Sequence, residues 1–194
     1  MARRAGVVCH GLSERQRRSP WKTLEYGLAP EGQREVVILL PMPGAWTQFH
    51  VHLVFSTKRR RELIAPEWEP RLYEYLGGIA REQRCELLAA NGMPDHVHPL
   101  LRFRADLAGA NLVRHLKSRS SLWINEEGLA GRRFAWQEGY GGFTVGTETL
   151  ARVKGYIAKQ KKHHERMTFV DEVKAMLKRA GMEDRLEEVL GNLG

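Results

Sequence analysis

"FHVHLVF" at residues 49–55 alternates between two faces, as a half-buried β-strand does. One face takes Phe49, Val51, Leu53 and Phe55, and the other takes His50, His52 and Val54. The tripeptide His-Val-His recurs within "HVHPLLRF" at 96–103, which we interpret as a second strand. Two histidines at i and i+2 of a strand point to one face and can offer two imidazoles to one metal ion. The arrangement of these two segments therefore decides both the fold and the site.

The segments around these strands complete a β-α-β-β-α-β order. Apolar spacing predicts helices at 65–85, 106–127, 147–166 and 168–181, a strand at 85–91, and a short strand followed by a glycine-rich loop within 131–146. This order predicts an α+β fold of the ferredoxin-like βαββαβ plan: an antiparallel sheet with helices on one face and an additional C-terminal helix that bears Tyr156. In this topology the first and third strands are central neighbours, so the two His-Val-His segments lie side by side.

The charge and composition point to a polyanionic partner. The chain has 194 residues and a net charge of +8, and nucleic acid is the commonest partner of such basic proteins. Cys9 and Cys85 are far apart and form no disulfide framework, so we expect a cytoplasmic protein. The apolar run at 36–46 is broken by two prolines and is too short to span a bilayer, so we expect no membrane partner.

Residues 1–45 differ from the rest of the chain. They are rich in arginine, glycine and proline and show no sustained period. We interpret them as a flexible basic extension with one short element at 35–40, and a misassigned start codon is an alternative. Residues 46–194 form the expected folded domain.

The residues alone leave both histidine pairs open as a metal site. Histidines on the polar face of a strand are usually solvated or hydrogen-bonded. The second pair has more around it, because the turn "GMPD" at 92–95 places Asp95 beside the imidazole of His96. Such a carboxylate orients a ligand histidine by contacting the ring nitrogen that does not bind the metal.

The helix expected at 147–166 carries two further candidates. Its apolar stripe runs through Leu150, Val153 and Ile157, and Tyr156 and Gln160 lie together on one edge of that stripe. A tyrosine offers a phenol nucleophile, and an amide carbonyl suits a hard divalent cation. The spacing alone favours the alternative, a tyrosine half-packed on the core and a solvated glutamine.

Three stretches together carry a family resemblance: "MPDHVH" at 93–98, "FAWQEGYGGFTV" at 134–145 and "VKGYIAKQKKHHERMTF" at 153–169. They resemble the HUH-type tyrosine transposases of the insertion-sequence 200/605 group and their repeat-associated domesticated relatives. The resemblance runs from about Thr47 to the C-terminal end. "PDHVH" followed at this separation by "YIxxQ" is a specific combination.

The resemblance implies a role for each candidate residue. It implies that His96, His98 and Gln160 bind Mg²⁺ or Mn²⁺ and that Tyr156 is the catalytic nucleophile, with His50 and His52 as neighbours of the site. It implies a transposase that cleaves and rejoins single-stranded DNA through a 5′-phosphotyrosine and a free 3′-OH. It also implies a homodimer that recognises hairpin ends of DNA. Pro99 departs from the family, which usually has an aliphatic residue there.

Basic clusters supply candidate phosphate contacts. The predicted DNA-binding residues are Lys58, Arg59, Arg60, Arg114, Lys117, Arg119, Arg132 and Arg133. The alternative is that each cluster is a solvated face.

Two other functions compete with an active transposase. The first is a non-catalytic nucleic-acid-binding protein, domesticated or decayed, on the same fold; it lacks the aromatic pattern of an RNA-recognition sheet and leaves the pairing of Tyr156 with Gln160 unexplained. The second is a replication initiator or relaxase of the same chemistry, and the short chain argues against it.

Overall fold

The computed structural model describes residues 24–28, 34–37 and 46–191 and divides the chain into two compact units, 1–45 and 46–194. In the first unit, β1 (Leu24–Leu28) pairs antiparallel with β2 (Arg34–Val37). The sequence led us to expect one short element, at 35–40. Most of the segment interpreted as a flexible extension lies outside the described residues, so that interpretation stays a prediction. Within the described ranges, no helix is both long and apolar enough to cross a membrane.

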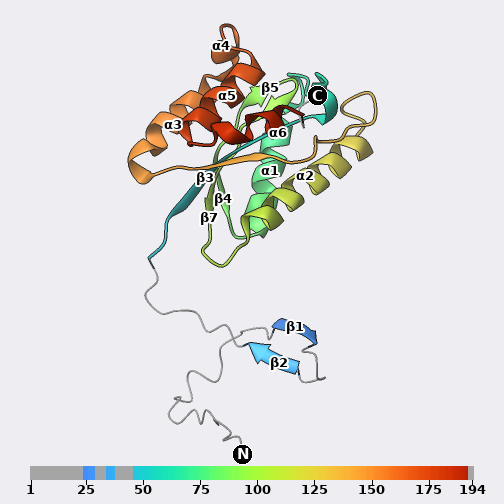
Figure 1. Ribbon diagram of the computed structural model, residues 1–194. Helices are drawn as coiled ribbons and strands as arrows, with labels where there is room; N and C mark the ends of the chain where they lie inside the picture. The colour runs from blue at the N-terminus through green and yellow to red at the C-terminus, as the bar shows by residue number, and fades with distance from the viewer. Residues whose placement is uncertain (1–23, 29–33, 38–45, 192–194) are drawn as a thin grey trace, which may run out of the picture. The chain divides into compact units, whose positions relative to one another are not determined.

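The second unit is built on an antiparallel sheet (Figure 1). Its strands are β3 (Phe49–Ser56), β4 (Glu86–Ala89), β5 (Gly92–Met93), β6 (His96–Val97), β7 (Leu100–Phe103) and β8 (Gly141–Thr144). β3 is central: it pairs with β7 and β6 along one side and with β8 along the other, and β4 pairs with β7. The predicted α+β plan is confirmed, and so is the adjacency of the two His-Val-His segments.

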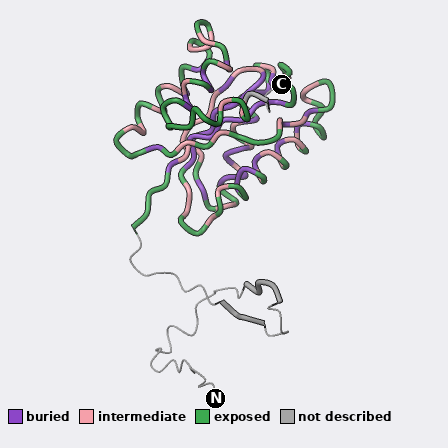
Figure 2. The backbone as a smooth tube through the Cα atoms, in the orientation of Figure 1, coloured by how far each residue is buried: buried purple, intermediate pink, exposed green. Residues whose placement is uncertain are grey.

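Helices cover both faces of this sheet, whereas the sequence led us to expect helices on one face. They are α1 (Glu69–Glu82), α2 (Gly109–Glu126), α3 (Leu150–Ala158), α4 (Gln160–His164), α5 (Phe169–Arg179) and α6 (Leu186–Gly191), with short 3-10 turns at Lys58–Arg60 (η2), Thr147–Thr149 (η3) and Glu183–Arg185 (η4). Leu53 and Phe55 pack with the apolar residues of α1 and α2, whereas Val54 between them packs with those of α5. The strand is therefore buried on two sides (Figure 2).

This second helical layer changes the expected character of the sheet. The alternation in β3 predicted a half-buried strand, but His52 and the three residues after it are all buried. The reason is that α3 and α5 bring apolar side chains to the histidine-bearing face, where Ile157 packs with Leu100 and Val173 packs with Val54. The histidines face a covered site instead of an open surface.

Two element boundaries differ from the sequence prediction. The helix expected at 147–166 is interrupted at Lys159 (φ −102°, ψ 16°), which separates α3 from α4. The strand expected ahead of the glycine-rich loop lies inside it as β8, because Trp136 forms only an isolated bridge with Thr57. Lys117 donates to the carbonyls of Gln137 (2.5 Å) and Gly139 (2.6 Å), which holds a turn there before pairing resumes.

Pro99 interrupts the predicted strand at 96–103 without shifting its register. Val97 lies opposite Phe55 and Leu100 lies opposite His52, so β6 and β7 follow a single register along β3. The Leu53 N–H donates to the Pro99 carbonyl at 2.8 Å. Proline has no N–H to return, which leaves a gap in the ladder between the two strands.

Candidate active site

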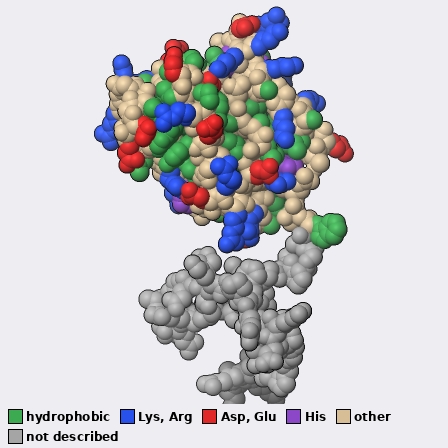
Figure 3. Space-filling view, turned by 180° about the vertical axis from the view of Figure 1, so that it is seen from behind, with side chains coloured by type: hydrophobic (Ala, Val, Ile, Leu, Met, Phe, Trp, Pro, Cys, Tyr) green, Lys and Arg blue, Asp and Glu red, His purple; other side chains and the backbone are tan. Residues whose placement is uncertain are grey.

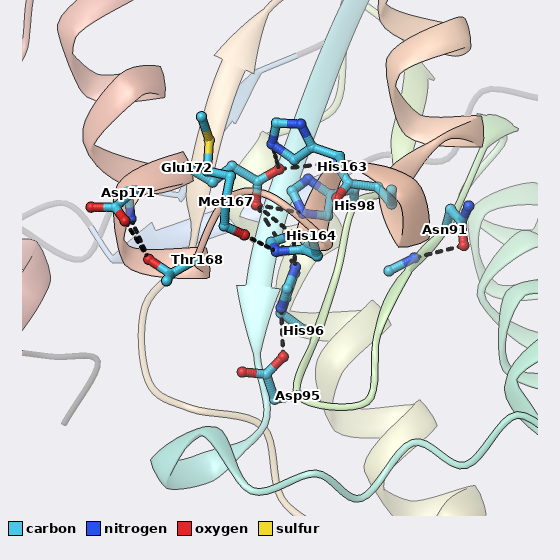
Figure 4. Close-up of polar contacts among 12 residues, drawn as sticks. Asn91, Asp95, His96, His98, His163, His164, Met167, Thr168, Asp171 and Glu172 are labelled. Atoms are coloured by element: carbon cyan, nitrogen blue, oxygen red, sulfur yellow. Dashed lines mark hydrogen bonds and ion pairs between the residues drawn. The ribbon is translucent and has the colours of Figure 1, made fainter.

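The second His-Val-His segment and α5 meet at a buried carboxylate (Figure 4). His96 and His98 are fully buried on the face that α5 covers, and Glu172 of α5 is buried with them. The Nε2 atom of His98 lies 3.3 Å from Glu172 Oε2, and that of His96 lies 3.8 Å from the same oxygen. The start of α5 is fixed by Thr168, whose hydroxyl accepts from the Asp171 N–H at 3.2 Å.

α4 adds a third imidazole to this cluster. His164 Nε2 lies 3.0 Å from His96 Nε2 and 3.2 Å from Glu172 Oε2. One ligand atom from each of His96, His98, His164 and Glu172 falls within 4.8 Å of all the others. The cluster therefore has the dimensions of a cation site built from three separate elements.

Each imidazole is oriented through its other nitrogen. His96 Nδ1 contacts Asp95 Oδ1 at 2.7 Å, and His164 Nδ1 lies 2.9 Å from the Met167 carbonyl. His98 Nδ1 lies 3.1 Å from His52 Nε2, so a histidine of the first pair supports one of the second. Engaging Nδ1 in this way leaves Nε2 free as a ligand. His52 is thus a neighbour of the cluster, as the resemblance implied.

Arg60 links the cluster to the loop after β3. Its Nε and Nη2 donate to Asp95 Oδ2 at 3.1 and 3.0 Å, and its guanidinium lies 5.2 Å from the Phe169 ring centroid. Arg59 and Arg60 both have positive φ, 58° and 53°. Two consecutive non-glycine residues in that region are strained, and such strain concentrates at functional sites.

Tyr156 and Gln160 reach the other oxygen of the same carboxylate. The Tyr156 hydroxyl donates to Glu172 Oε1, and Gln160 Nε2 donates to it at 3.0 Å. Gln160 is fully buried, so the alternative of a solvated glutamine is wrong. Residues from α3, α4 and α5 therefore converge with the histidine-bearing strand, although the helix breaks between Tyr156 and Gln160.

Burial sets the charge states of the site. It lowers the pKa of His96 to about 4, although Asp95 acts in the opposite direction. Burial and the nearby His98 lower the pKa of His52 to about 3. Burial alone would raise the pKa of Glu172, but His98, Tyr156 and Gln160 outweigh it and hold this pKa below its usual range. Burial and the bond to Glu172 raise the pKa of Tyr156. Neutral imidazoles and an ionised carboxylate are the forms that bind metal.

Several lone pairs in the cluster have no hydrogen-bond partner. Among the described residues, His98 Nε2, Gln160 Oε1 and Glu172 Oε2 are buried and unbonded. Buried polar atoms are normally satisfied, and each of these atoms can coordinate a cation. The residues present therefore fit a divalent metal ion.

The predicted DNA-binding residues fall into separate groups. Lys58, Arg59 and Arg60 form η2, and Arg60 adjoins the site through Asp95. Arg114, Lys117 and Arg119 lie on α2, and Arg132 and Arg133 are exposed after it. Arg119 pairs with Glu82. Figure 3 shows one face of the unit, on which lysine and arginine are interspersed with aspartate and glutamate.

Sequence reasoning missed two members of the cluster, His164 and Glu172. A signal for Glu172 was present, because the inward face of α5 holds Phe169, Val173 and Met176 and the glutamate falls on that same face. An acidic residue on an apolar stripe is expensive to bury and therefore points to function. His164 had no such signal, because it stands in the basic run "KQKKHHER" at 159–166.

Comparison with known proteins places the chain in a family. The family described as "Transposase IS200 like" matches residues 45–160. The ISDra2 transposase TnpA of Deinococcus radiodurans is 29% identical over 133 residues, which is 63% of this chain and 95% of that protein. The transposase for insertion sequence element IS200 of Salmonella typhimurium is 30% identical over 115 residues, 56% of this chain and 74% of that protein.

Two solved structures are also similar. A Deinococcus radiodurans transposase has a TM-score of 0.49 and 27% identity, covering 63% of this chain and 98% of that one. A REP-associated tyrosine transposase bound to a REP hairpin has a TM-score of 0.48 and 15% identity, covering 65% of this chain and 74% of that one. Because the family match spans more than half of the chain, this protein belongs to the IS200-like transposase family.

Proposed function

We propose that this member of the IS200-like transposase family cleaves and rejoins single-stranded DNA, with Tyr156 as its nucleophile. The observation that carries the proposal is that the Tyr156 hydroxyl and the imidazoles of His96 and His98 converge on one buried carboxylate. The Tyr156 oxygen attacks the phosphorus, and the bond from phosphorus to the 3′ oxygen breaks. The products are a 5′-phosphotyrosine and a free 3′-OH, and attack by a 3′-OH on the phosphotyrosine rejoins the DNA.

His96, His98 and Gln160 would hold Mg²⁺ or Mn²⁺ beside that nucleophile. A cation bound there supplies Lewis-acid stabilisation of charge on the scissile phosphate. Asp95 keeps the Nδ1 proton on His96, and His52 orients His98. The unpaired oxygen of Gln160 and the unpaired Nε2 of His98 support this assignment. The helices over this face exclude water from the buried histidines.

The remaining partners follow from the family resemblance and from the charge. We propose that the DNA carries hairpin ends, that the protein acts as a homodimer in the cytoplasm, and that the basic residues contact phosphates. The net charge of +8 supports a polyanionic partner. The eight residues proposed for these contacts are Lys58, Arg59, Arg60, Arg114, Lys117, Arg119, Arg132 and Arg133.

The non-catalytic alternative needs a sheet surface that binds nucleic acid. α3 and α5 cover the histidine-bearing face of this sheet, and α1 and α2 cover the other. A non-catalytic protein that does not descend from an active transposase would also have no reason to bury a tyrosine hydroxyl and two histidines around one carboxylate. The structure of the site therefore favours catalysis.

Formation of a covalent adduct tests the proposal. The protein is incubated with single-stranded DNA from the flanks of its own gene and Mn²⁺, and adducts are resolved on denaturing gels. We expect an adduct with the wild type and none with Tyr156→Phe, which should still bind the DNA. Tyr140→Phe is the matched control, because Tyr140 is exposed. An adduct formed by the Tyr156→Phe variant would show that another residue is the nucleophile.

A further inference from the structure

We propose that His164 and Glu172 are ligands of the metal ion in this protein, in addition to His96, His98 and Gln160. Both lie beyond the residues that match the family, 45–160. The inference rests on the proposed metal-dependent function, and it concerns which residues coordinate the cation. It makes α4 and α5 part of the metal site and not merely a cover for it.

All three imidazoles of the cluster are oriented by contacts to their Nδ1 atoms. Asp95, His52 and the Met167 carbonyl engage the Nδ1 atoms of His96, His98 and His164 respectively. All three Nε2 atoms then point into one space together with Glu172 Oε2 (Figure 4). Orientation of a histidine through its second nitrogen is the usual companion of metal ligation. Here it extends to His164 as well as to the motif histidines.

The imidazoles of His96 and His164 face each other through their Nε2 atoms. Their Nε2 atoms are 3.0 Å apart. A carboxylate and a backbone carbonyl accept from the Nδ1 atoms, so in the neutral, metal-binding form of both rings the Nδ1 atoms carry the protons and both Nε2 atoms present lone pairs. Two facing lone pairs at this distance repel each other unless something positive lies between them or bridges them. A shared cation removes that repulsion.

Glu172 supplies the negative charge that such a cation needs. It is 2% exposed, and its Oε2 lies within 3.8 Å of all three Nε2 atoms without a hydrogen bond. Its Oε1 is occupied by Tyr156 and Gln160. One carboxylate thus has one oxygen for the metal and one for the nucleophile, which fixes the position of the phenol relative to the cation. An isolated buried carboxylate is costly, and a cation offsets that cost.

The donor set also predicts which metal binds more tightly. Mg²⁺ prefers an octahedron of oxygen ligands and retains its waters, whereas imidazole nitrogens suit transition metals. Three imidazoles and one carboxylate, together with the amide oxygen of Gln160, therefore favour Mn²⁺ over Mg²⁺. A site of two imidazoles and one amide oxygen would discriminate less.

Calorimetric titration of the full-length, chelator-treated protein with Mn²⁺ tests the ligands one at a time. The variants are Glu172→Gln and His164→Gln, with the exposed Glu165→Gln and the α2 residue His115→Gln as matched controls. Loss of residues that merely orient ligands costs about 10–100-fold in metal affinity, so we expect Glu172→Gln and His164→Gln each to weaken Mn²⁺ binding at least about tenfold. The controls should bind as the wild type does, and wild-type binding of Mg²⁺ should be weaker than that of Mn²⁺.

The possible outcomes distinguish a failure of this ligand assignment from a failure of the proposed function. If both variants bind Mn²⁺ as the wild type does while His98→Ala loses binding, His164 and Glu172 are not ligands and the motif site stands. If the wild type binds neither metal, the proposed metal-dependent function fails as well. Circular dichroism establishes that each variant is folded.

The number of imidazole nitrogens bound to the metal can also be measured by spectroscopy. This measurement does not depend on whether a Glu172 variant folds. Pulsed electron paramagnetic resonance of the Mn²⁺-loaded wild type should show three imidazole nitrogens, and His164→Gln should show two. A wild-type protein with only two coupled imidazoles would overturn the assignment of His164.

Discussion

The two faces of the central sheet are both covered by helices and both have apolar contacts, but only one of them also buries a cluster of imidazoles and a carboxylate. Beneath α1 and α2, β3 contributes Leu53 and Phe55 to an apolar core. Beneath α3 and α5, the same strand contributes His52 to a cluster of imidazoles around a carboxylate. Strand alternation places the two environments one residue apart. The core face is built for stability, whereas the site face buries polar groups that only a function explains.

The difference shows that contacts on both faces of the sheet position the histidines of the site. On the apolar face, Leu53 and Phe55 of β3 and Val97 of β6 pack in one core with α1 and α2. The histidine-bearing face combines the apolar contacts of α3 and α5 with polar contacts to Glu172. Changes on the first face should therefore alter the free energy of unfolding, and changes on the second should alter metal binding and reaction.

The largest expected effect is on the apolar face. Leu116 of α2 is fully buried there, and Leu116→Ala should lower the free energy of unfolding by about 2–5 kcal/mol through lost burial and a cavity. Denaturant titration measures this loss. In the folded fraction, Mn²⁺ affinity should stay unchanged. Leu122→Ala on the exposed side of the same helix is the control and should change stability by less than about 0.5 kcal/mol. Loss of metal binding in folded Leu116→Ala protein would show that the two faces are not separable.

Acid should destabilise the metal-free protein through the site face. The folded pKa values of His52 and His96, about 3 and about 4, lie below the ordinary 6.5, because burial disfavours the charged imidazole. Between pH 6.5 and 4 the unfolded chain therefore binds more protons than the folded one, and stability falls as the pH falls. Each histidine should contribute about 1–3 kcal/mol over this window, at about 1.4 kcal/mol per pH unit.

Denaturant titrations with chelator at several pH values measure this dependence. Glu172, whose pKa is depressed, adds to the loss only below its ordinary value of 4.5. His52→Leu should flatten the profile between pH 6.5 and 4. An unchanged profile in that variant would mean that His52 is charged in the folded protein.

A smaller effect, on the salt dependence of DNA binding, distinguishes which side of the protein the DNA contacts. Arg59 is exposed in η2, next to the residue that contacts Asp95, whereas Arg71 is exposed on α1 and pairs with Glu127. Arg59→Asn keeps a residue type that tolerates positive φ. Each phosphate contact contributes about 0.7 to the salt slope of single-strand binding, so this variant should lower the slope by about that amount. Arg71→Gln should leave it unchanged, and the opposite result would put the DNA over the α1 and α2 layer.

The sequence predicts much of the fold because alternation and helical spacing are local signals. They identified β3, the strand order and the placement of His96 and His98 beside the first pair. They did not predict the second helical layer, because the apolar stripe of α5 does not say which face it covers. Nor did they identify His164 and Glu172, whose contacts depend on the break at Lys159 and on how α5 packs. Long-range packing determines those positions, and no local pattern records it.

The smallest expected effect lies at the boundary between the two faces, at Pro99. The ladder with β3 continues in register across this residue, and the Leu53 N–H donates to the Pro99 carbonyl, but proline cannot return a hydrogen bond. Pro99→Val restores that donor, worth about 0.5–1.5 kcal/mol. The loss of proline's restriction on the unfolded chain opposes it by about 0.4–1 kcal/mol. We therefore expect a net gain of a few tenths of a kcal/mol, with Mn²⁺ affinity unchanged, in paired urea and metal titrations. If the valine variant unfolds more easily and binds Mn²⁺ more weakly, the proline itself shapes the backbone that carries His98.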